Sequence, residues 1–161
     1  MYDIPGEFSK LKELFAAGAP VAEPVLDSFV KIEGLGFGYL LHRVGRVHVV
    51  TTAEHARKAF ASLAQLHALG FVHFDARLEN LLEIDGKLCW IDVVSLAKHF
   101  EESAERLRRS DVEQLARSML RKRTGGELHS SVREAIEAYT PGNNGTVEAL
   151  AEAVAGALLL K

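Results

Sequence analysis

The sequence predicts an α+β domain, with short antiparallel strands in the first half of the chain and helices in the second. The dipeptide Asp85-Gly86, between two short apolar runs, is the strongest short-range signal of a β-hairpin. Apolar residues recur at helical spacing before residue 70 and again after residue 110. The 161 residues, of which 25% are charged, suit one compact domain with its own core.

The N-terminal part combines one helix with two strands. Apolar residues three and four positions apart predict a helix over Phe8–Ala17, which Gly18 ends. Two strands follow, Val25–Ile32 and Phe37–Val44, and the glycines between them allow a tight turn. Arg46–Val50 reads as a third, shorter extended segment.

A helix and a hairpin make up the middle of the chain. Thr51 and Glu54 form a capping box, which predicts a helix from there to Leu69. Strands over 80–84 and 87–91 then form the hairpin. Three helices fill the remainder, from Ser110 to about Arg123, from Ser131 to Tyr139, and from Thr146 to about Leu160. Ser110 with Glu113, and Ser131 with Glu134, form the capping boxes that start the first two.

Composition narrows the functional classes. The net charge of −3 gives no reason to expect nucleic-acid or anionic-membrane binding. The single cysteine, Cys89, excludes an internal disulfide framework and is expected as a small apolar filler in a buried strand. The N-terminus lacks the features of a signal peptide, and the apolar run 149–160 is too short to span a bilayer. We therefore expect a cytoplasmic location.

One polar stretch carries most of the functional information. His73, Asp75 and Asn80 follow the order H-x-D-x-x-x-x-N, directly after a helix and before the hairpin. Phosphoryl transfer from a nucleotide needs a carboxylate to orient the attacking hydroxyl and an amide oxygen to hold a metal on the phosphates. Asp92, at the end of an apolar strand, is a second carboxylate for that metal. The structural alternative is that Asp75, Asn80 and Asp92 only form turns and that His73 is a hydrogen-bonded core residue.

Four segments resemble the protein-kinase-like superfamily. LHALGFVHFDARLENLL resembles the catalytic loop and the helix before it, and LCWIDVVSLAK the metal-binding segment. RRSDVEQLARSML is similar to the central helix of the large lobe, and PVLDSFVKIEGLGFGYLLHRVG to the last small-lobe strands and the hinge. The resemblance implies a protein-kinase-like fold, with a partial β small lobe and hinge over 1–45 and a mostly helical large lobe over 46–161.

The resemblance also implies a role for each matching polar residue. Asp75 would be the catalytic base, Asn80 and Asp92 would bind Mg²⁺, and Arg77 would neutralise phosphate charge. Asp92 as a solvated turn residue and Arg77 as an ordinary surface charge are the alternatives.

Scaffold and nucleotide-binding positions follow from the same resemblance. His73 and Asp111 would hold the loop, although an Asp in the first turn of a helix is also favoured by the helix dipole alone. The hinge would fall at Leu40–Val44, and the backbone positions that would bind the adenine of ATP are Leu41, His42, Arg43 and Val44.

The chain departs from the kinase pattern at its beginning. Too few residues precede Phe8 to form three strands, so the first three small-lobe strands are expected to be missing. Those strands would carry the glycine-rich phosphate lid and the Lys that pairs with the helix containing Glu13. Gly34, Gly36 and Gly38 form a G-x-G-x-G pattern, but a phosphate loop here is the weaker interpretation, since the glycines fall between paired strands.

Further departures bear on substrate and control. Phe74 replaces the Arg of H-R-D, which argues against control by a phosphorylated activation loop. Val93-Val94 replaces Phe-Gly after the metal Asp, which stiffens that segment. The short stretch between Asp92 and Asp111 lacks an A-P-E motif and leaves little room to dock a peptide, which favours a small-molecule-kinase-like or degenerate domain.

Two functions from different classes therefore remain. The first is a kinase-like phosphotransferase that uses ATP and Mg²⁺ to phosphorylate a hydroxyl acceptor, with activity limited by the missing lid. The second is an inactive pseudokinase, a regulatory module that binds a protein partner or a second copy through an exposed small-lobe strand edge. A third interpretation is that the chain is a truncated product or an engineered fragment.

Overall fold

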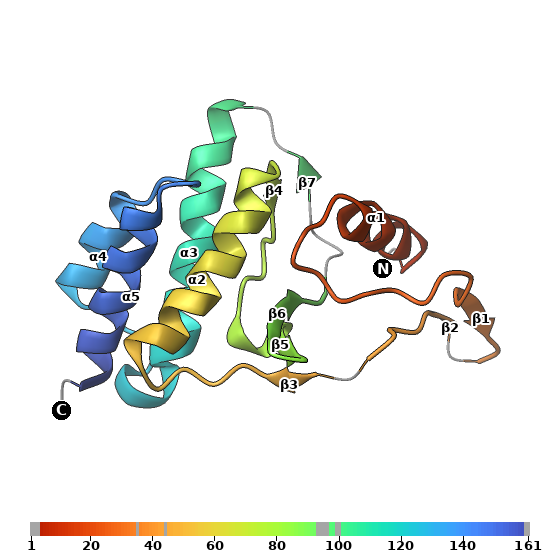
Figure 1. Ribbon diagram of the computed structural model, residues 1–161, viewed down its shortest axis with the longest axis horizontal. Helices are drawn as coiled ribbons and strands as arrows, with labels where there is room; N and C mark the ends of the chain where they lie inside the picture. Colours follow the sequence, from red (N-terminus) through yellow and green to blue (C-terminus); the bar gives the residue numbers. More distant parts are fainter. Residues whose placement is uncertain (1–3, 35, 44, 93–96, 99–100, 160–161) are drawn as a thin grey trace.

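A computed structural model describes residues 4–34, 36–43, 45–92, 97–98 and 101–159. Within these residues the chain forms five α-helices and three small antiparallel sheets, which confirms the predicted α+β class (Figure 1). The helices are α1 (Ile4–Ala16), α2 (Ala53–Ala68), α3 (Glu101–Thr124), α4 (Ser130–Glu137) and α5 (Asn144–Leu159). The strands are β1 (Val30–Ile32), β2 (Gly36–Gly38), β3 (Arg46–Val47), β4 (Phe71–Val72), β5 (Leu81–Ile84), β6 (Lys87–Trp90) and β7 (Ala97–Lys98). A 3₁₀ turn, η1 (Leu78–Asn80), precedes β5.

The helices α2 to α5 pack into one bundle on one side of the molecule (Figure 1). Each helix contributes an apolar stripe at helical spacing, and the residues on it are fully buried. Leu63 and Leu66 of α2 meet residues such as Leu115 of α3 and Leu150 of α5 in one continuous core. Among the described residues, no helix combines the length and the apolar character needed to cross a bilayer.

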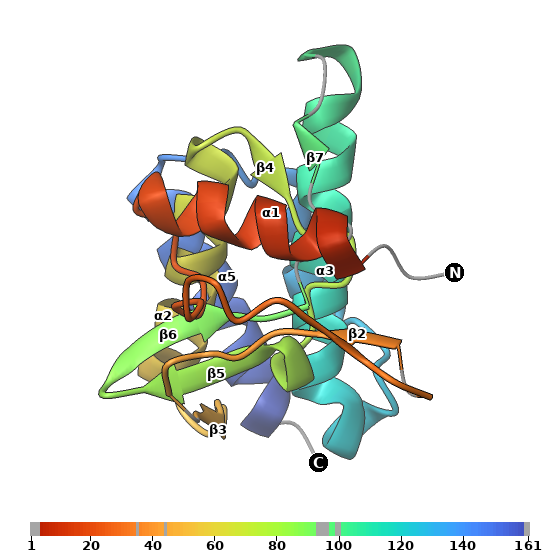
Figure 2. The same cartoon turned by 90° about the vertical axis from the view of Figure 1, so that its right-hand side faces the viewer.

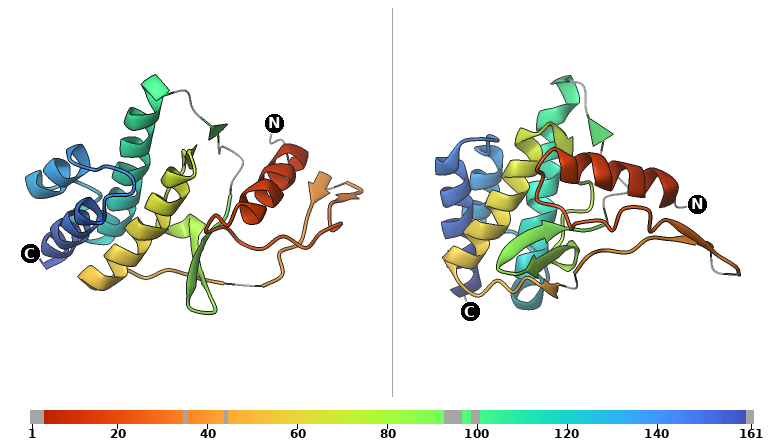
Figure 3. Two further views of the ribbon diagram at one scale, coloured as in Figure 1. Left: turned by 45° about the horizontal axis from the view of Figure 1, so that its top comes forward. Right: turned by 45° about the vertical axis from the view of Figure 1, so that its right-hand side comes forward.

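The helix α1 and the β1–β2 hairpin lie on the other side, away from α4 and α5 (Figures 2 and 3). The ring of Phe8 stacks on Phe29 at 5.7 Å and contacts Tyr39 at 5.1 Å between ring centroids. The segment after α1 joins the central sheet, since Trp90 donates its backbone N–H to Pro20 at 2.8 Å. The sheet β3–β5–β6 therefore lies between the two sides.

The β5–β6 hairpin confirms the strongest local prediction. Leu81 pairs with Trp90 and Ile84 with Lys87. The two turn residues, Asp85 and Gly86, have φ of 51° and 76°. Two consecutive positive φ values are what a two-residue type I′ turn requires, and Asp-Gly supplies them at low cost.

The predicted N-terminal strands are much shorter than expected. Val25–Ile32 and Phe37–Val44 are reduced to β1 and β2, of three residues each. Asp27 adopts a left-handed conformation, with φ of 61°, and this turns the chain before β1. Strand pairing is interrupted there, because the Leu40 N–H bonds to a side chain, the Ser28 hydroxyl, at 2.9 Å. The last residue of the predicted second strand lies outside the described residues.

Helix starts were predicted less well than helix ends. The helix α3 begins at Glu101 instead of Ser110, because 101–109 is rich in helix formers and carries supporting pairs such as Arg109–Glu105 at 2.6 Å. Thr52, and not Thr51, caps α2 by accepting the His55 N–H. The residue that caps α4 is His129, one position before the helix, and α5 begins two residues before Thr146. The short pair β4–β7 has no sequence pattern and was not predicted.

Candidate functional site

The polar loop, residues 73–80, runs between β4 and β5 and is fixed by Asp111. This carboxylate is fully buried and accepts the backbone N–H groups of His73 at 2.6 Å and Phe74 at 2.8 Å. Hydrogen bonds to a carboxylate are roughly twice as strong as neutral ones, so they hold the start of the loop firmly. Asp111 does contact the loop, as the resemblance implied, but it does so from the middle of α3 and not from a first turn.

A second buried contact extends this anchor. His67 lies with its Nε2 atom 3.1 Å from Asp111 and its Nδ1 atom 2.9 Å from the Tyr139 hydroxyl. Burial lowers the pKa of His67, although the charge of Asp111 acts in the opposite direction. The neutral ring therefore donates from Nε2 to Asp111 and accepts the Tyr139 proton at Nδ1. The local sequence around His67 does not predict this chain of bonds, because Tyr139 lies 72 positions away.

His73, at the start of the polar loop, is a buried residue. Its ring is fully buried against Trp90, with 4.9 Å between ring centroids. Burial lowers the pKa of His73, so the ring is neutral and donates from Nε2 to the Ile91 carbonyl at 3.1 Å. The contact links the polar loop to the end of β6. Both predicted interpretations of His73, scaffold and core histidine, are compatible with this geometry.

The structure brings Asp75, Arg77 and Asn80 together. The side-chain amide of Asn80 donates to the Asp75 carbonyl and to its carboxylate Oδ2, both at 3.0 Å. Arg77 donates to the same Oδ2 at 2.6 Å and remains about half exposed. Two neighbours therefore fix the orientation of a partly exposed carboxylate, a more definite arrangement than a simple turn requires.

Asp92 lies beside this group, at the end of the β5–β6 hairpin. Ile91 donates its N–H to the Asn80 carbonyl at 3.0 Å, so Asp92 directly follows a residue bonded to Asn80. Its negative charge contributes to raising the pKa of Arg77, where Asp75 is the main cause. Asp92 is exposed and has a φ of 57°. Val93-Val94, whose stiffness was predicted, lies outside the described residues.

A magnesium ion fits the chemistry of these donors. Asn80 and Asp92 offer amide and carboxylate oxygens, and Mg²⁺ in nucleotide sites typically uses one or two carboxylates plus phosphate oxygens and waters. Among the described residues, no group of three or more His, Cys, Asp or Glu side chains could hold a metal. Such a site would therefore depend on the phosphates of a ligand.

The acidic residue of α1 that faces the site is Glu7. Tyr39 donates to Glu7 Oε1 at 2.6 Å, and Glu7 is only 8% exposed. Burial raises the pKa of Glu7, the Tyr39 hydrogen bond lowers it, and the charge of Asp92 raises it further. Glu13, the glutamate named in the kinase resemblance, is exposed and pairs with Lys10 at 3.0 Å. Nothing local in the sequence distinguishes the two glutamates.

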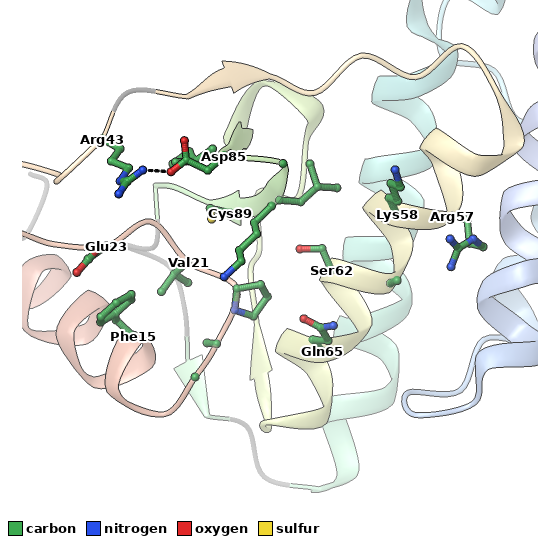
Figure 4. A pocket seen from close by; sticks show the side chains of 18 residues that line it. Phe15, Val21, Glu23, Arg43, Arg57, Lys58, Ser62, Gln65, Asp85 and Cys89 are labelled. Atoms are coloured by element: carbon green, nitrogen blue, oxygen red, sulfur yellow. Dashed lines mark hydrogen bonds and ion pairs between the residues drawn. The ribbon is translucent and has the colours of Figure 1, made fainter.

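Residues 41–43 of the predicted hinge contact the core, the segment after α1 and the β5–β6 turn. Leu41 packs against the core, and the His42 N–H bonds to the Glu23 carbonyl at 3.0 Å. The guanidinium of Arg43 pairs with Asp85 at the hairpin turn and lines a pocket on that side (Figure 4). The fourth predicted position, Val44, lies outside the described residues.

Comparisons with protein-family models and with curated proteins give no match for this chain. Function therefore has to be inferred from the side chains themselves. The polar loop offers the most specific starting point, because its carboxylate, amide and guanidinium are held by several independent contacts.

Proposed function

We propose that this chain is a kinase-like phosphotransferase domain that binds ATP with Mg²⁺ and transfers phosphate to a hydroxyl acceptor. The observation that supports this most directly is the contact between Asp75 and Asn80, on a loop anchored by the buried Asp111. Asp92 lies next to them in space, because the preceding residue, Ile91, donates its backbone N–H to the Asn80 carbonyl. A kinase-like fold, with α1 and the β1–β2 hairpin as a reduced small lobe, is part of the same proposal.

Each polar residue has a definite role in the proposed reaction. Both side-chain hydrogen bonds to the Asp75 carboxylate from described residues end on Oδ2, so Oδ1 would accept the proton of the attacking hydroxyl. Asn80 and Asp92 would hold Mg²⁺, which when bound neutralises phosphate charge. Arg77 would add a second positive charge near the transferred phosphate.

The backbone conformation next to Asp75 supports the proposal that this loop is an active site. Phe74, directly before Asp75, has a φ of 65°, which is a genuine outlier for a bulky residue. The bond from its N–H to Asp111 stabilises that conformation. Strained residues of this kind tend to cluster at active sites, where the surrounding structure maintains them.

Weak nucleotide binding and slow turnover are expected. The described part of α1 presents Glu7, whose partner is the Tyr39 hydroxyl and not a lysine. Phosphate positioning supplies most of the catalysis in this reaction class, and a Lys and a glycine-rich lid normally provide it.

Thermal unfolding with and without millimolar ATP and Mg²⁺ tests the binding step. Binding to the native state should raise the midpoint temperature. At a ligand concentration near ten times Kd, the free energy of unfolding should increase by about 1.4 kcal/mol. The Asp92→Asn variant should lose the Mg²⁺-dependent shift, and Asn keeps the left-handed backbone accessible. Asp27→Asn, also exposed and left-handed but outside the site, is the matched control. No shift with the wild-type chain would contradict the proposal.

Single-turnover ATP consumption tests the chemical step. With Mg²⁺ present, Asp75→Asn should lower the rate at least tenfold while nucleotide binding persists, because a neutral amide cannot accept the proton. An unchanged rate would exclude Asp75 as the base.

A pseudokinase that binds a partner is the second candidate, and one surface favours it. The sheet β1–β2 has two strands in the described residues, so both of its edges are open. Large apolar side chains, 48–67% exposed, lie on and around β1 to β3: Leu26, Val30, Phe37, Leu40, Val47 and Val49. Sizing chromatography with Leu40→Lys, and with Leu159→Lys as a control at the other end of the chain, distinguishes this candidate. A dimer lost only in the first variant, together with no ATP response, would favour it.

A further inference from the structure

We infer that the chain has a second binding site, for a small organic anion, in a pocket of about 820 Å³ beside the β5–β6 hairpin. The hairpin pocket is formed by the end of α1 and the segment after it, by α2 and by the hairpin (Figure 4). None of Asp75, Asn80 and Asp92 lines it, so it is separate from the polar loop. Its size is within the usual range for small-molecule sites, about 300–1,000 Å³.

An unpartnered buried hydroxyl points into this pocket. Ser62 is 5% exposed, and its Oγ atom has no hydrogen-bond partner in the described residues. Figure 4 shows the hydroxyl directed from α2 into the pocket, with the amide of Gln65 one turn along the same face. A buried polar group without a partner is costly, so a ligand that accepts a hydrogen bond from Ser62 recovers that cost.

The charged residues that line the pocket favour an anion. Four of them are basic, Arg43, Arg57, Lys58 and Lys87, against the two acids Glu23 and Asp85. Asp85 is already paired with Arg43. Lys87 forms no ion pair within the described residues, and the pair of Lys58 with Glu54 is long, at 3.8 Å. Arg57 is paired with Glu54 at 2.6 Å, so the two lysines are the cations left to meet an anionic ligand.

The remaining lining is apolar, which indicates that the anion has an organic body. Phe15 and Val21 line the pocket from α1 and the segment after it, and Ala61 and Leu88 line it from α2 and the hairpin. Such a surface binds an aromatic or aliphatic group, and a few polar groups then set its orientation. A carboxylate or a phosphate on that body matches the two lysines and the Ser62 hydroxyl.

Titration with 1-anilinonaphthalene-8-sulfonate, which becomes fluorescent in apolar sites, tests this inference. The wild-type chain should bind it at least tenfold more tightly than the Lys58→Glu, Lys87→Glu double variant. Arg121→Glu, an exposed charge reversal on α3, should bind within twofold of wild type. The neutral analogue N-phenyl-1-naphthylamine should bind the wild type and the double variant alike.

A second variant separates binding from folding. Ala61→Phe fills the pocket from α2 and should abolish probe binding while the helical circular dichroism stays unchanged. Displacement of the probe from the wild-type chain by benzoate or by phenyl phosphate, but not by benzyl alcohol, supports the inference and identifies the preferred anionic group. Equal binding by the wild type and the double variant, equal loss in Arg121→Glu, or displacement by benzyl alcohol alone would overturn it.

Discussion

Asp111 is the residue on which the geometry of the polar loop depends most. One buried carboxylate accepts hydrogen bonds from His73 N, Phe74 N and His67 Nε2. Burying a carboxylate is expensive, and these charge-assisted bonds offset the cost. Removing the carboxylate would break all three of these hydrogen bonds.

Asp111→Asn should lower the free energy of unfolding by about 2–4 kcal/mol. An amide accepts through only one oxygen, so at least one buried donor would face an NH₂ group, and each unsatisfied donor costs about 1–3 kcal/mol. Urea denaturation measures the change. Glu113→Gln, which removes an exposed ion pair with Arg117 on the same helix, is the control and should cost about 0.5 kcal/mol or less. Equal losses in the two variants would show that Asp111 has no special role.

Acid should destabilise the protein through its buried histidines. The pKa values of His67 and His73 are lowered from 6.5 by burial, so below pH 6.5 the unfolded chain binds protons that the folded chain does not. Stability contributed by the neutral rings is therefore complete above pH 6.5 and falls as the pH decreases towards the folded pKa values. Glu7 acts in the opposite direction, because its raised pKa favours the folded state at low pH.

Urea denaturation between pH 7.5 and 5 measures this dependence. His67→Gln should reduce the slope of the free energy of unfolding against pH, because glutamine does not titrate. The reduction should correspond to the uptake of at most one proton on unfolding. The difference between the two slopes isolates the histidine from Glu7, which both proteins retain. Identical slopes would mean that folding leaves the pKa of His67 unchanged.

At the level of secondary-structure elements, local signals were reliable and distant ones were not. The turn Asp85-Gly86 and the end of α2 depend on a few neighbouring residues, and both were predicted correctly. The spacing of Asp75 and Asn80 is also local, and the structure places them in contact. The bonds Glu7–Tyr39 and His67–Tyr139 join residues 32 and 72 positions apart, and no sequence pattern announces them. The start of α3 was missed because Ser110 has the features of a cap but lies inside a strongly helical segment.

Gly45 should be essential for the docking of β3 on β5. A Cβ at this position would lie 2.7 Å from Ile84 Cγ1 and from Leu82 Cβ, and 3.1 Å from the Glu83 carbonyl oxygen. Gly45→Ala should therefore cost about 1–3 kcal/mol of stability, measured by urea denaturation. Gly156→Ala in α5, where a Cβ meets nothing within 4 Å, should instead stabilise by about 0.5–1 kcal/mol. The prediction is wrong if both variants change stability in the same direction.

The whole molecule has a densely packed side and a thinly packed one. The bundle of α2 to α5 holds most of the buried apolar residues, whereas the described residues between 25 and 49 are mostly exposed. Phe8 and Glu7 of α1 both contact Tyr39, the residue directly after β2. The predicted division at residue 45 remains a prediction, but local stability should differ on its two sides.

Hydrogen exchange followed by mass spectrometry should reveal this difference. Amides of 25–43 should exchange at least 100-fold faster than those of 60–66 in α2, because few buried contacts restrain the β1–β2 hairpin. Leu40→Lys should leave the exchange of α2 unchanged, since residue 40 is exposed. Equal protection of both segments would mean that the hairpin is stabilised by a contact, such as a second copy of the chain.

The path from Tyr139 through His67 to Asp111 affects how natural variants of this chain should be interpreted. Tyr139 follows α4 and does not line the hairpin pocket, yet its hydroxyl bonds to the ring that supports the anchor of the loop. A Phe at position 139 would keep the packing and delete one proton donor. Such a variant should therefore behave like one with a disturbed polar loop. The position of residue 139 in the chain gives no sign of that effect.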